Sequence, residues 1–349
     1  MSKRTWLVLA DGTVFEGTSF GAEGTVTGEA VFSTTMTGFQ EILTDPGYIG
    51  QILVQTFPIA GSSGTNSFDD TSDYGGPAGY ITREWCTTPS NFRMEADIDD
   101  FMKRRNIIGL YGIDTRRLTR ILREKGTMNG RITDIEPTNI NIDEIAAYTP
   151  DITLISASES AVHKTENAEH NIALIDYGHK KSIIGLFNKL SCDVTVIPFS
   201  DNINTADYDG FVLSNGAGNP ADCTEEIEAV RTLIASGKPI FGIGLGHQLL
   251  ALANGGTTAK HKHGHRGANQ PVIDLDTGRT HITAQNHGYI VQSIPEDIGH
   301  INLVSGNDRT CEGIVYNNIP ALSMQFVPSA EGGVNATVYL VERFLGLVK

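Results

Sequence analysis

The second half of the chain alternates short apolar runs with amphipathic stretches, and this rhythm restricts the possible folds more than any other feature. Apolar runs that suit buried strands lie at 172–175, 194–197, 210–213 and 240–243. Stretches with helical periodicity lie at 182–190, 223–236 and 245–253, and a closing helix is expected at 338–347. Strands that alternate with helices of this length predict an open parallel α/β sheet.

The first half of the chain has a different pattern. It is rich in Gly and Thr, with short β-like runs at 6–10, 30–32 and 51–56 and helical stretches at 97–105 and 114–125. Residues 153–170 are polar and have no sustained periodicity, which is typical of a linker. We therefore expect an α/β protein with a β-rich α/β domain at 1–152, a linker at 153–170 and the open parallel sheet at 171–349.

Charge and cysteine content argue against several classes of protein. The formal net charge of −15 disfavours non-specific binding to nucleic acid or to an anionic membrane, because both need basic patches. The four cysteines are widely spaced without a C-x-x-C pair, so neither a disulfide framework nor a zinc ribbon is expected. There is no apolar signal-peptide core and no run of about 18 apolar residues. We expect a cytoplasmic protein with reduced thiols.

The most informative segment is a strand that passes into a helix through a single residue. The apolar run ends at Ile243, Gly244 makes the turn, and Leu245 begins the helix. This is the architecture of a nucleophile elbow, whose turn residue projects at the carboxyl end of the sheet beside a helix N-terminus. A packing turn in some other Rossmann-like sheet would give the same local pattern.

Longer segments resemble one family. Residues 242–248 (G-I-G-L-G-H-Q) resemble the G-[IV]-C-L-G-H-Q elbow of class I glutamine amidotransferases. Residues 262–269 resemble the K-x-G-H-R-G-x-N segment of the carbamoyl phosphate synthetase small chain. The same family is matched in order by 37–46 (M-T-G-Y-Q-E), 112–120 (G-I-D-T-R-x-L-T-R), 213–220 (L-S-N-G-P-G-D-P) and 283–289 (T-S-Q-N-H-G-F). The chain is therefore similar to this family over nearly its whole length.

The resemblance implies a cysteine–histidine–acid triad, which this sequence lacks. Gly244 occupies the nucleophile position, and the family's Q-Y-H-P-E-A appears as Q-F-V-P-S-A at 325–330, with Val327 for the histidine and Ser329 for the acid. A laboratory knockout or a sequencing error would normally change one position, whereas natural decay of an unused glutaminase accounts for all three. A displaced nucleophile is the alternative, since Cys223 and Cys311 lie in the same domain.

The resemblance also implies a glutamine-binding pocket that is better kept than the triad. Gly216 and Gly218 would offer backbone contacts, and Leu245 and Gln248 would hold the amide. The α-amino and carboxylate end of the substrate would be lined by Asn286, Gly288 and Tyr289. The last position is Gly47, where the family commonly has Ser. The same residues could instead persist because they hold the loops in shape.

Three alternating histidines are a second candidate site. On a regular strand His261, His263 and His265 would share one face, as metal ligands can. Only His265 matches a family histidine, and no acid or cysteine joins them at ligand spacing. We therefore expect a solvated strand face and no metal site, and we expect His247 and His287 to be hydrogen-bonding residues that hold the local shape.

The resemblance implies a partner as well. Small chains of this family serve a large ATP-using chain, which makes carbamoyl phosphate from bicarbonate, ATP and ammonia for pyrimidine or arginine synthesis. ATP and Mg²⁺ would then bind to the large chain, and this chain would carry no cofactor and bind glutamine weakly. Without its triad it would serve a complex that uses free ammonia, or act in assembly and regulation. The alternatives are a non-enzymatic glutamine-binding scaffold and a glutaminase with an unconventional nucleophile.

Overall fold

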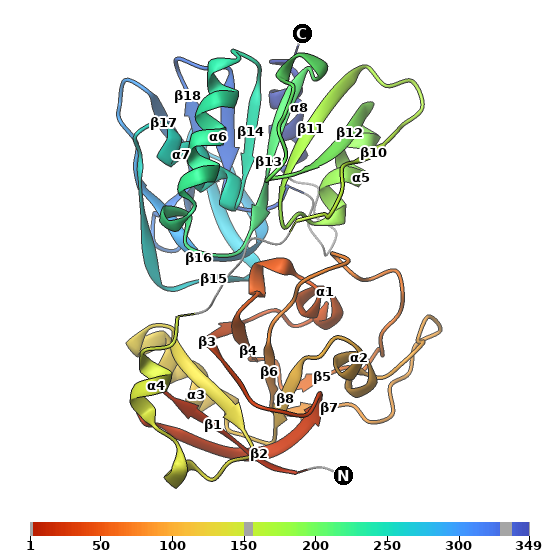
Figure 1. Ribbon diagram of the computed structural model, residues 1–349, viewed down its shortest axis with the longest axis vertical. Coiled ribbons are helices and arrows are strands. Elements are labelled where there is room, and N and C mark those ends of the chain that lie inside the picture. The colour runs from red at the N-terminus through yellow and green to blue at the C-terminus, as the bar shows by residue number, and fades with distance from the viewer. Residues whose placement is uncertain (1–2, 150–155, 329–336, 349) are drawn as a thin grey trace. The chain divides into compact units, whose positions relative to one another are not determined.

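The computed structural model describes residues 3–149, 156–328 and 337–348, and the chain divides into two compact units. The first unit is Met1–Ile152 and the second is Thr153–Lys349 (Figure 1). Both contain helices and strands, so the predicted α/β class is confirmed, with a β-rich first unit and a long sheet in the second. No helix in the described ranges is long and apolar enough to cross a membrane.

The first unit is built on a closed barrel. Its strands follow the order β1-β2-β8-β6-β4-β3-β9, and β9 pairs with β1 to close it. The strands are β1 (Arg4–Leu9), β2 (Val14–Gly21), β3 (Val26–Ser33), β4 (Gln51–Gln55), β6 (Gly79–Thr82), β8 (Ile108–Tyr111) and β9 (Met128–Thr133). The short strands β5 (Ile59–Ala60) and β7 (Glu84–Trp85) form a separate pair.

Short helices accompany the barrel. They are α1 (Phe39–Leu43), α2 (Ile98–Arg104), α3 (Thr115–Lys125) and α4 (Ile142–Ala146). Helix α3 shows why such segments form where the sequence predicts: Asp114 caps it by accepting the Arg117 backbone N–H, and Gly126 ends it with a φ of 97°. Its buried residues Leu118 and Leu122 pack into the barrel core.

The second unit contains one ten-stranded sheet among its described residues, in the order β10-β12-β11-β13-β14-β19-β18-β17-β15-β16. Strands β12, β11, β13, β14 and β19 run parallel, and the others pair antiparallel. The parallel strands are β11 (His170–Tyr177), β12 (Cys192–Pro198), β13 (Gly210–Gly216), β14 (Ile240–Ile243) and β19 (Ala321–Met324). The antiparallel strands are β10 (Ala161–His163), β15 (Thr257–Asp274), β16 (Thr280–Ser293), β17 (Gly299–Ser305) and β18 (Cys311–Tyr316).

Helices cover both faces of this sheet, as expected for an open α/β fold. Helices α5 (Lys181–Lys189) and α8 (Val338–Leu345) share one apolar cluster with Phe241 and Ile243. Helices α6 (Thr224–Ala235) and α7 (Leu245–Ala253) share the other with Ile240. Alternate side chains of β14 therefore pack into the two apolar clusters on opposite faces of the sheet, which is why the strand is apolar throughout.

Part of the expected linker is structured. Within 153–170, strand β10 pairs antiparallel with β12, with Val162 opposite Thr195. All three of its residues are exposed, so this edge strand lacks the apolar alternation by which a strand is recognised in a sequence. The predicted linker therefore contains a paired edge strand at these positions, while 153–155 lie outside the described residues.

Candidate active site

The strand-to-helix turn has the geometry of a nucleophile elbow. Gly244 lies between β14 and α7 with φ 58° and ψ −112°, a conformation that costs a residue with a side chain about 1–3 kcal/mol. Its backbone N–H donates to the Met324 carbonyl oxygen of β19 at 2.9 Å, which ties the turn to the next strand. The elbow is therefore formed and buried, but its apex carries no nucleophilic group.

The neighbouring glycines allow α7 to lie close against the sheet. A Cβ on Gly242 would come within 2.8 Å of the Gly246 carbonyl oxygen, and one on Gly246 within 2.3 Å of the Leu213 carbonyl oxygen. A Cβ on Gly216 would meet the Tyr177 carbonyl oxygen at 2.4 Å and Leu245 at 2.9 Å. Close backbone packing alone therefore requires these glycines, as the packing explanation predicts.

Of the other two triad positions, Val327 lies among the described residues and Ser329 does not. Val327 follows β19, is half-buried, and packs against the apolar cluster that includes Phe326 and Leu340. Its described neighbours are therefore those of an apolar side chain at the edge of a core. Ser329, the position matched to the acid, lies outside the described residues.

Several of the predicted pocket residues lie together. Gln248 of α7 is 4% exposed, and its Nε2 donates to the Tyr289 carbonyl oxygen at 2.8 Å and to Gln325 Oε1 at 3.0 Å. Leu245, one helical turn before it, is the neighbour of Gly216. The structure thus joins α7, the end of β13 and β16 through predicted pocket positions.

The remaining predicted pocket positions lie on β16, after β13 and in the first unit. Asn286 and Gly288 are half-buried on β16, beside Tyr289. Gly218 follows β13 with a φ of 107°, a backbone conformation that favours glycine. Gly47 belongs to the first unit, in the short 3-10 helix Pro46–Tyr48, and its N–H donates to Asp45 at 2.8 Å.

The two candidate displaced nucleophiles are poorly suited to attack. Burial raises the pKa of both Cys223 and Cys311 to about 12. At neutral pH both are therefore thiols rather than thiolates, and the thiolate is the nucleophile. Neither lies at a strand-to-helix turn, because Cys223 precedes α6 and Cys311 begins β18.

His247 and His287 make hydrogen bonds, as expected. His247 is fully buried, its Nδ1 lies 2.7 Å from Ser323 Oγ, and burial lowers its pKa to about 3. His287 Nδ1 donates to the Tyr289 carbonyl oxygen at 2.9 Å. Burial lowers the pKa of His287 as well, so both rings are neutral: His247 connects α7 to β19, and His287 bonds within β16.

The alternating histidines do not form a solvated strand face, and that prediction was wrong. His265 is 5% exposed, and two acids distant in the sequence accompany it: Nδ1 lies 3.1 Å from Glu312 Oε1 and Nε2 lies 2.9 Å from Asp308 Oδ2. Burial alone would lower the pKa of His265, but these two carboxylates outweigh it and raise the pKa. His261 also reaches Asp308, at 3.1 Å. The sequence signal that could have identified Glu312 is a single acid beside the apolar run 313–316.

Comparison with known proteins identifies the family. The carbamoyl-phosphate synthase small chain CPSase domain matches residues 7–132, and the class I glutamine amidotransferase domain matches residues 173–347. A carbamoyl phosphate synthase small chain from Bacillus cereus is 42% identical over 98% of this chain and 95% of its own length. The chain belongs to the carbamoyl-phosphate synthase small chain family.

Other members of the carbamoyl-phosphate synthase small chain family match equally well. The small chain of Clostridium perfringens is 42% identical, with 97% of this chain and 98% of that protein covered. The small chain of Lactococcus lactis is 42% identical, with 100% and 99% covered. Because these matches extend over both units, the family is established independently of the elbow.

Proposed function

We propose that this chain is the small subunit of a carbamoyl-phosphate synthase and that its own glutaminase step has been lost. The observation that carries the second part is Gly244: the elbow is formed, but its apex has no atom that could attack an amide. Val327 supports it, because a valine can neither accept the nucleophile's proton nor deliver one to departing ammonia.

The proposed partner is the large ATP-binding chain of the synthase, which would hold ATP and Mg²⁺. The relatives are named as small chains, and this chain covers nearly all of their length in both units. In such a complex this chain would contribute assembly and regulation, and free ammonia would be the nitrogen source.

The test is to reconstitute the chain with its large partner and to measure two reactions. We expect carbamoyl phosphate to form from ammonium, bicarbonate and ATP, and we expect no glutamate release from glutamine above background. Loss of a whole triad lowers the rate by about 10⁶-fold, so the expected contrast is large. Glutamate release at the rate of an ordinary amidotransferase would overturn the loss of the glutaminase step. Failure of a large chain to co-purify would favour the glutamine-binding scaffold.

We also propose that glutamine still binds weakly. Gln248 is buried and its Nε2 donates to the Tyr289 carbonyl oxygen and to Gln325 Oε1, which supports an ordered α7 side of the pocket. Calorimetry and thermal shift with saturating glutamine should report binding that asparagine does not give, because a ligand that binds only the native state raises its stability. The Gln248→Ala variant should lose the shift. Absence of any shift in the unaltered chain would mean that the residues serve only loop shape.

A further inference from the structure

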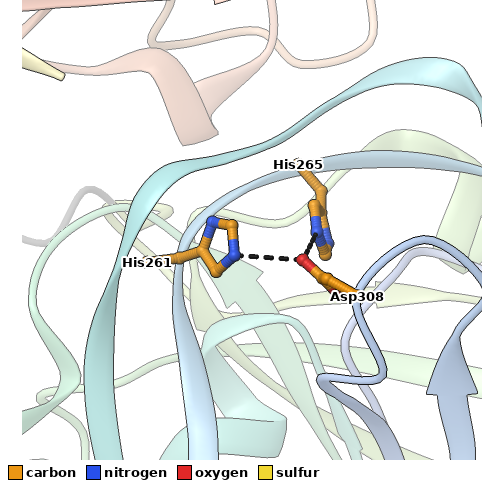
Figure 2. A group of neighbouring side chains, drawn as sticks. All are labelled: His261, His265 and Asp308. Atoms are coloured by element: carbon orange, nitrogen blue, oxygen red, sulfur yellow. Dashed lines mark hydrogen bonds and ion pairs between the residues drawn. The ribbon is translucent and has the colours of Figure 1, made fainter. Parts of the chain in front are cut away.

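We propose that His261, His265 and Asp308 bind one divalent transition-metal ion of the zinc type. Figure 2 shows both imidazole rings directed at the same carboxylate, His261 and His265 from β15 and Asp308 from the turn between β17 and β18. The three side chains offer two nitrogens and one oxygen, a ligand set that suits Zn²⁺, Co²⁺ or Ni²⁺ better than Mg²⁺ or Ca²⁺.

The distances between the ligand atoms fit a shared ion. Asp308 Oδ2 lies 3.1 Å from His261 Nε2 and 2.9 Å from His265 Nε2. Ligands about 2.0–2.2 Å from a tetrahedral zinc ion are separated from each other by roughly 3.3–3.5 Å. A shift of a few tenths of an ångström at each of these two contacts would bring them to that separation, and all three ligand atoms lie within 4.8 Å of one another.

An irregularity in β15 brings the two histidines together. On a regular strand, residues four apart are separated by about 13 Å. Here Lys260 pairs with Tyr289 and His265 with His287, so residues 261–264 lie opposite Gly288 alone. Gly264 turns the bulge with a φ of 68°, and the ring centroids of His261 and His265 come within 4.9 Å.

His265 has the outer support that metal-binding histidines usually have. With Nε2 directed at Asp308, its Nδ1 lies 3.1 Å from Oε1 of the fully buried Glu312. Glu312 Oε2 in turn accepts Gln285 Nε2 at 2.9 Å. A carboxylate on the second ring nitrogen fixes the tautomer and orientation of a histidine ligand and strengthens its basicity.

A second group of possible ligands shares His265 but fits an ion less well. His265, His287 and Glu312 also lie close together. His287, however, uses Nδ1 on the Tyr289 carbonyl oxygen and directs Nε2 at Gln285 Oε1, 3.1 Å away. Each ring nitrogen of His265 faces a different carboxylate: Nδ1 faces the buried Glu312, and Nε2 faces Asp308. We assign the ion to the Nε2 side, because the Asp308 side chain is 33% exposed and an ion can enter there.

One hydrogen bond opposes metal binding and limits its strength. Gly264 N–H donates to His261 Nδ1 at 3.0 Å, so Nε2 carries the ring proton and donates it to Asp308. An ion at Nε2 would displace that proton, and Nδ1 would have to take one up and release Gly264. Loss of one such bond weakens binding by roughly threefold to tenfold. The same bonds also hold the three residues together without an ion, and the experiment separates these two states.

The full chain, freed of any affinity tag and treated with a chelator, is titrated with ZnCl₂ by calorimetry. We expect one equivalent to bind and the melting temperature to rise, whereas MgCl₂ should have no effect. CoCl₂ should give the visible absorption of a low-coordinate nitrogen–oxygen site. His261→Gln and Asp308→Asn should each weaken zinc binding at least tenfold, and Glu312→Gln by about 10–100-fold, as expected of an outer partner.

His263→Gln is the matched control, because His263 lies on the same bulge with its ring 5.1 Å from that of His261 but is not one of the grouped ligands. It should bind zinc within about twofold of the unaltered chain, because it removes no ligand atom. Unchanged binding in His261→Gln, or loss in His263→Gln with retention in His261→Gln, would overturn the assignment. A thermal melt of each metal-free variant shows whether it folds. If Asp308→Asn does not fold, His261→Gln still tests the site, because His261 is only half-buried.

Discussion

A Cβ atom on Gly244 would lie 3.1 Å from the Cβ and 3.3 Å from the Cα of Asn215. Asn215 cannot easily move away, because its Nδ2 donates to the Gly178 carbonyl oxygen at 2.8 Å and its Oδ1 accepts the Lys180 N–H at 3.3 Å. The elbow is therefore closely packed around a glycine, and any side chain at position 244 must displace an anchored neighbour as well as adopt a strained backbone.

Gly244→Ala should lower the free energy of unfolding by about 1–3 kcal/mol, because alanine would be held at a positive φ with a tight Cβ contact. Urea unfolding monitored by circular dichroism measures the change. The matched control is Gly185→Ala, an exposed site within α5 where a Cβ would meet nothing within 4 Å. That variant should gain about 0.5–1 kcal/mol from better helix propensity. Equal effects at both sites would contradict the strained elbow.

Helices in both units could be predicted from the sequence because their signals are local. Helix α7 occupies 245–253 as expected, since an apolar strand, one glycine and an apolar helix follow in direct succession. Helix α3 was recognisable by its Asp114 cap and its terminal Gly126. Local caps and periodicity determine such boundaries.

The histidine group could not be predicted, because it depends on contacts between distant segments. His265 and Asp308 are 43 residues apart, and His265 and Glu312 are 47 apart. No local pattern indicates that the β17–β18 turn reaches β15, or that Gly264 interrupts the alternation of the histidines. The edge strand β10 was missed for a related reason: its pairing with β12 leaves no apolar periodicity.

Thiol labelling tests the absence of a displaced nucleophile. Cys86 is half-buried, whereas Cys192, Cys223 and Cys311 are buried, and burial raises the pKa of each of these three to about 12. Iodoacetamide at neutral pH should therefore label Cys86 in the native chain and all four cysteines only after unfolding, as peptide mass analysis would report. Rapid labelling of Cys223 or Cys311 in the native chain would reopen the case for a displaced nucleophile.

Tyr339→Phe should destabilise the second unit in a pH-dependent way. The Tyr339 hydroxyl donates to Asp274 Oδ2 at 2.7 Å and so ties α8 to the end of β15. Burial alone would raise the pKa of Asp274, but Tyr339 and the N–H groups of Thr277 and Asp276 outweigh it and lower the pKa. A carboxylate with a lowered pKa stabilises the fold above its unfolded pKa of about 3.9, and this contribution disappears as the pH falls through the folded value.

The expected loss for Tyr339→Phe is about 1.5–3 kcal/mol at neutral pH, the range for hydrogen bonds to charged groups. Urea unfolding at a series of pH values should show the difference begin to shrink below about pH 4, where Asp274 of the unfolded chain takes up a proton, and disappear once the pH has fallen through the lower pKa of Asp274 in the folded chain. Tyr148→Phe, at an exposed tyrosine, is the control and should change stability by less than about 0.5 kcal/mol. A difference that grows toward acid pH would mean that Tyr339 does not act through the ionised carboxylate.

Repair of the triad tests the proposed function directly. Gly244→Cys alone should not restore glutamate release, because a thiol with a free pKa of about 8.5 is only a few per cent thiolate at neutral pH. The larger obstacle is the leaving group: ammonia must depart with a proton, and Val327 has none to give. The single variant should nevertheless react slowly with an electrophilic glutamine analogue, since that reaction needs only attack by sulfur.

Turnover should require Gly244→Cys together with Val327→His, and it should rise further with Ser329→Glu, which would orient the imidazole. The effects should be strongly non-additive, because triad residues act as a unit.

Each variant is assayed for glutamate release and checked for folding, since cysteine at 244 and histidine at the half-buried Val327 position both cost stability. His247→Asn in the Gly244→Cys background is the control for an alternative base: it should leave glutamate release at background, because His247 is buried on Ser323 with a pKa of about 3, although loss of that buried hydrogen bond costs stability. Full activity from Gly244→Cys alone would show that some other residue already serves as the base and that Val327 is not what silences the glutaminase step.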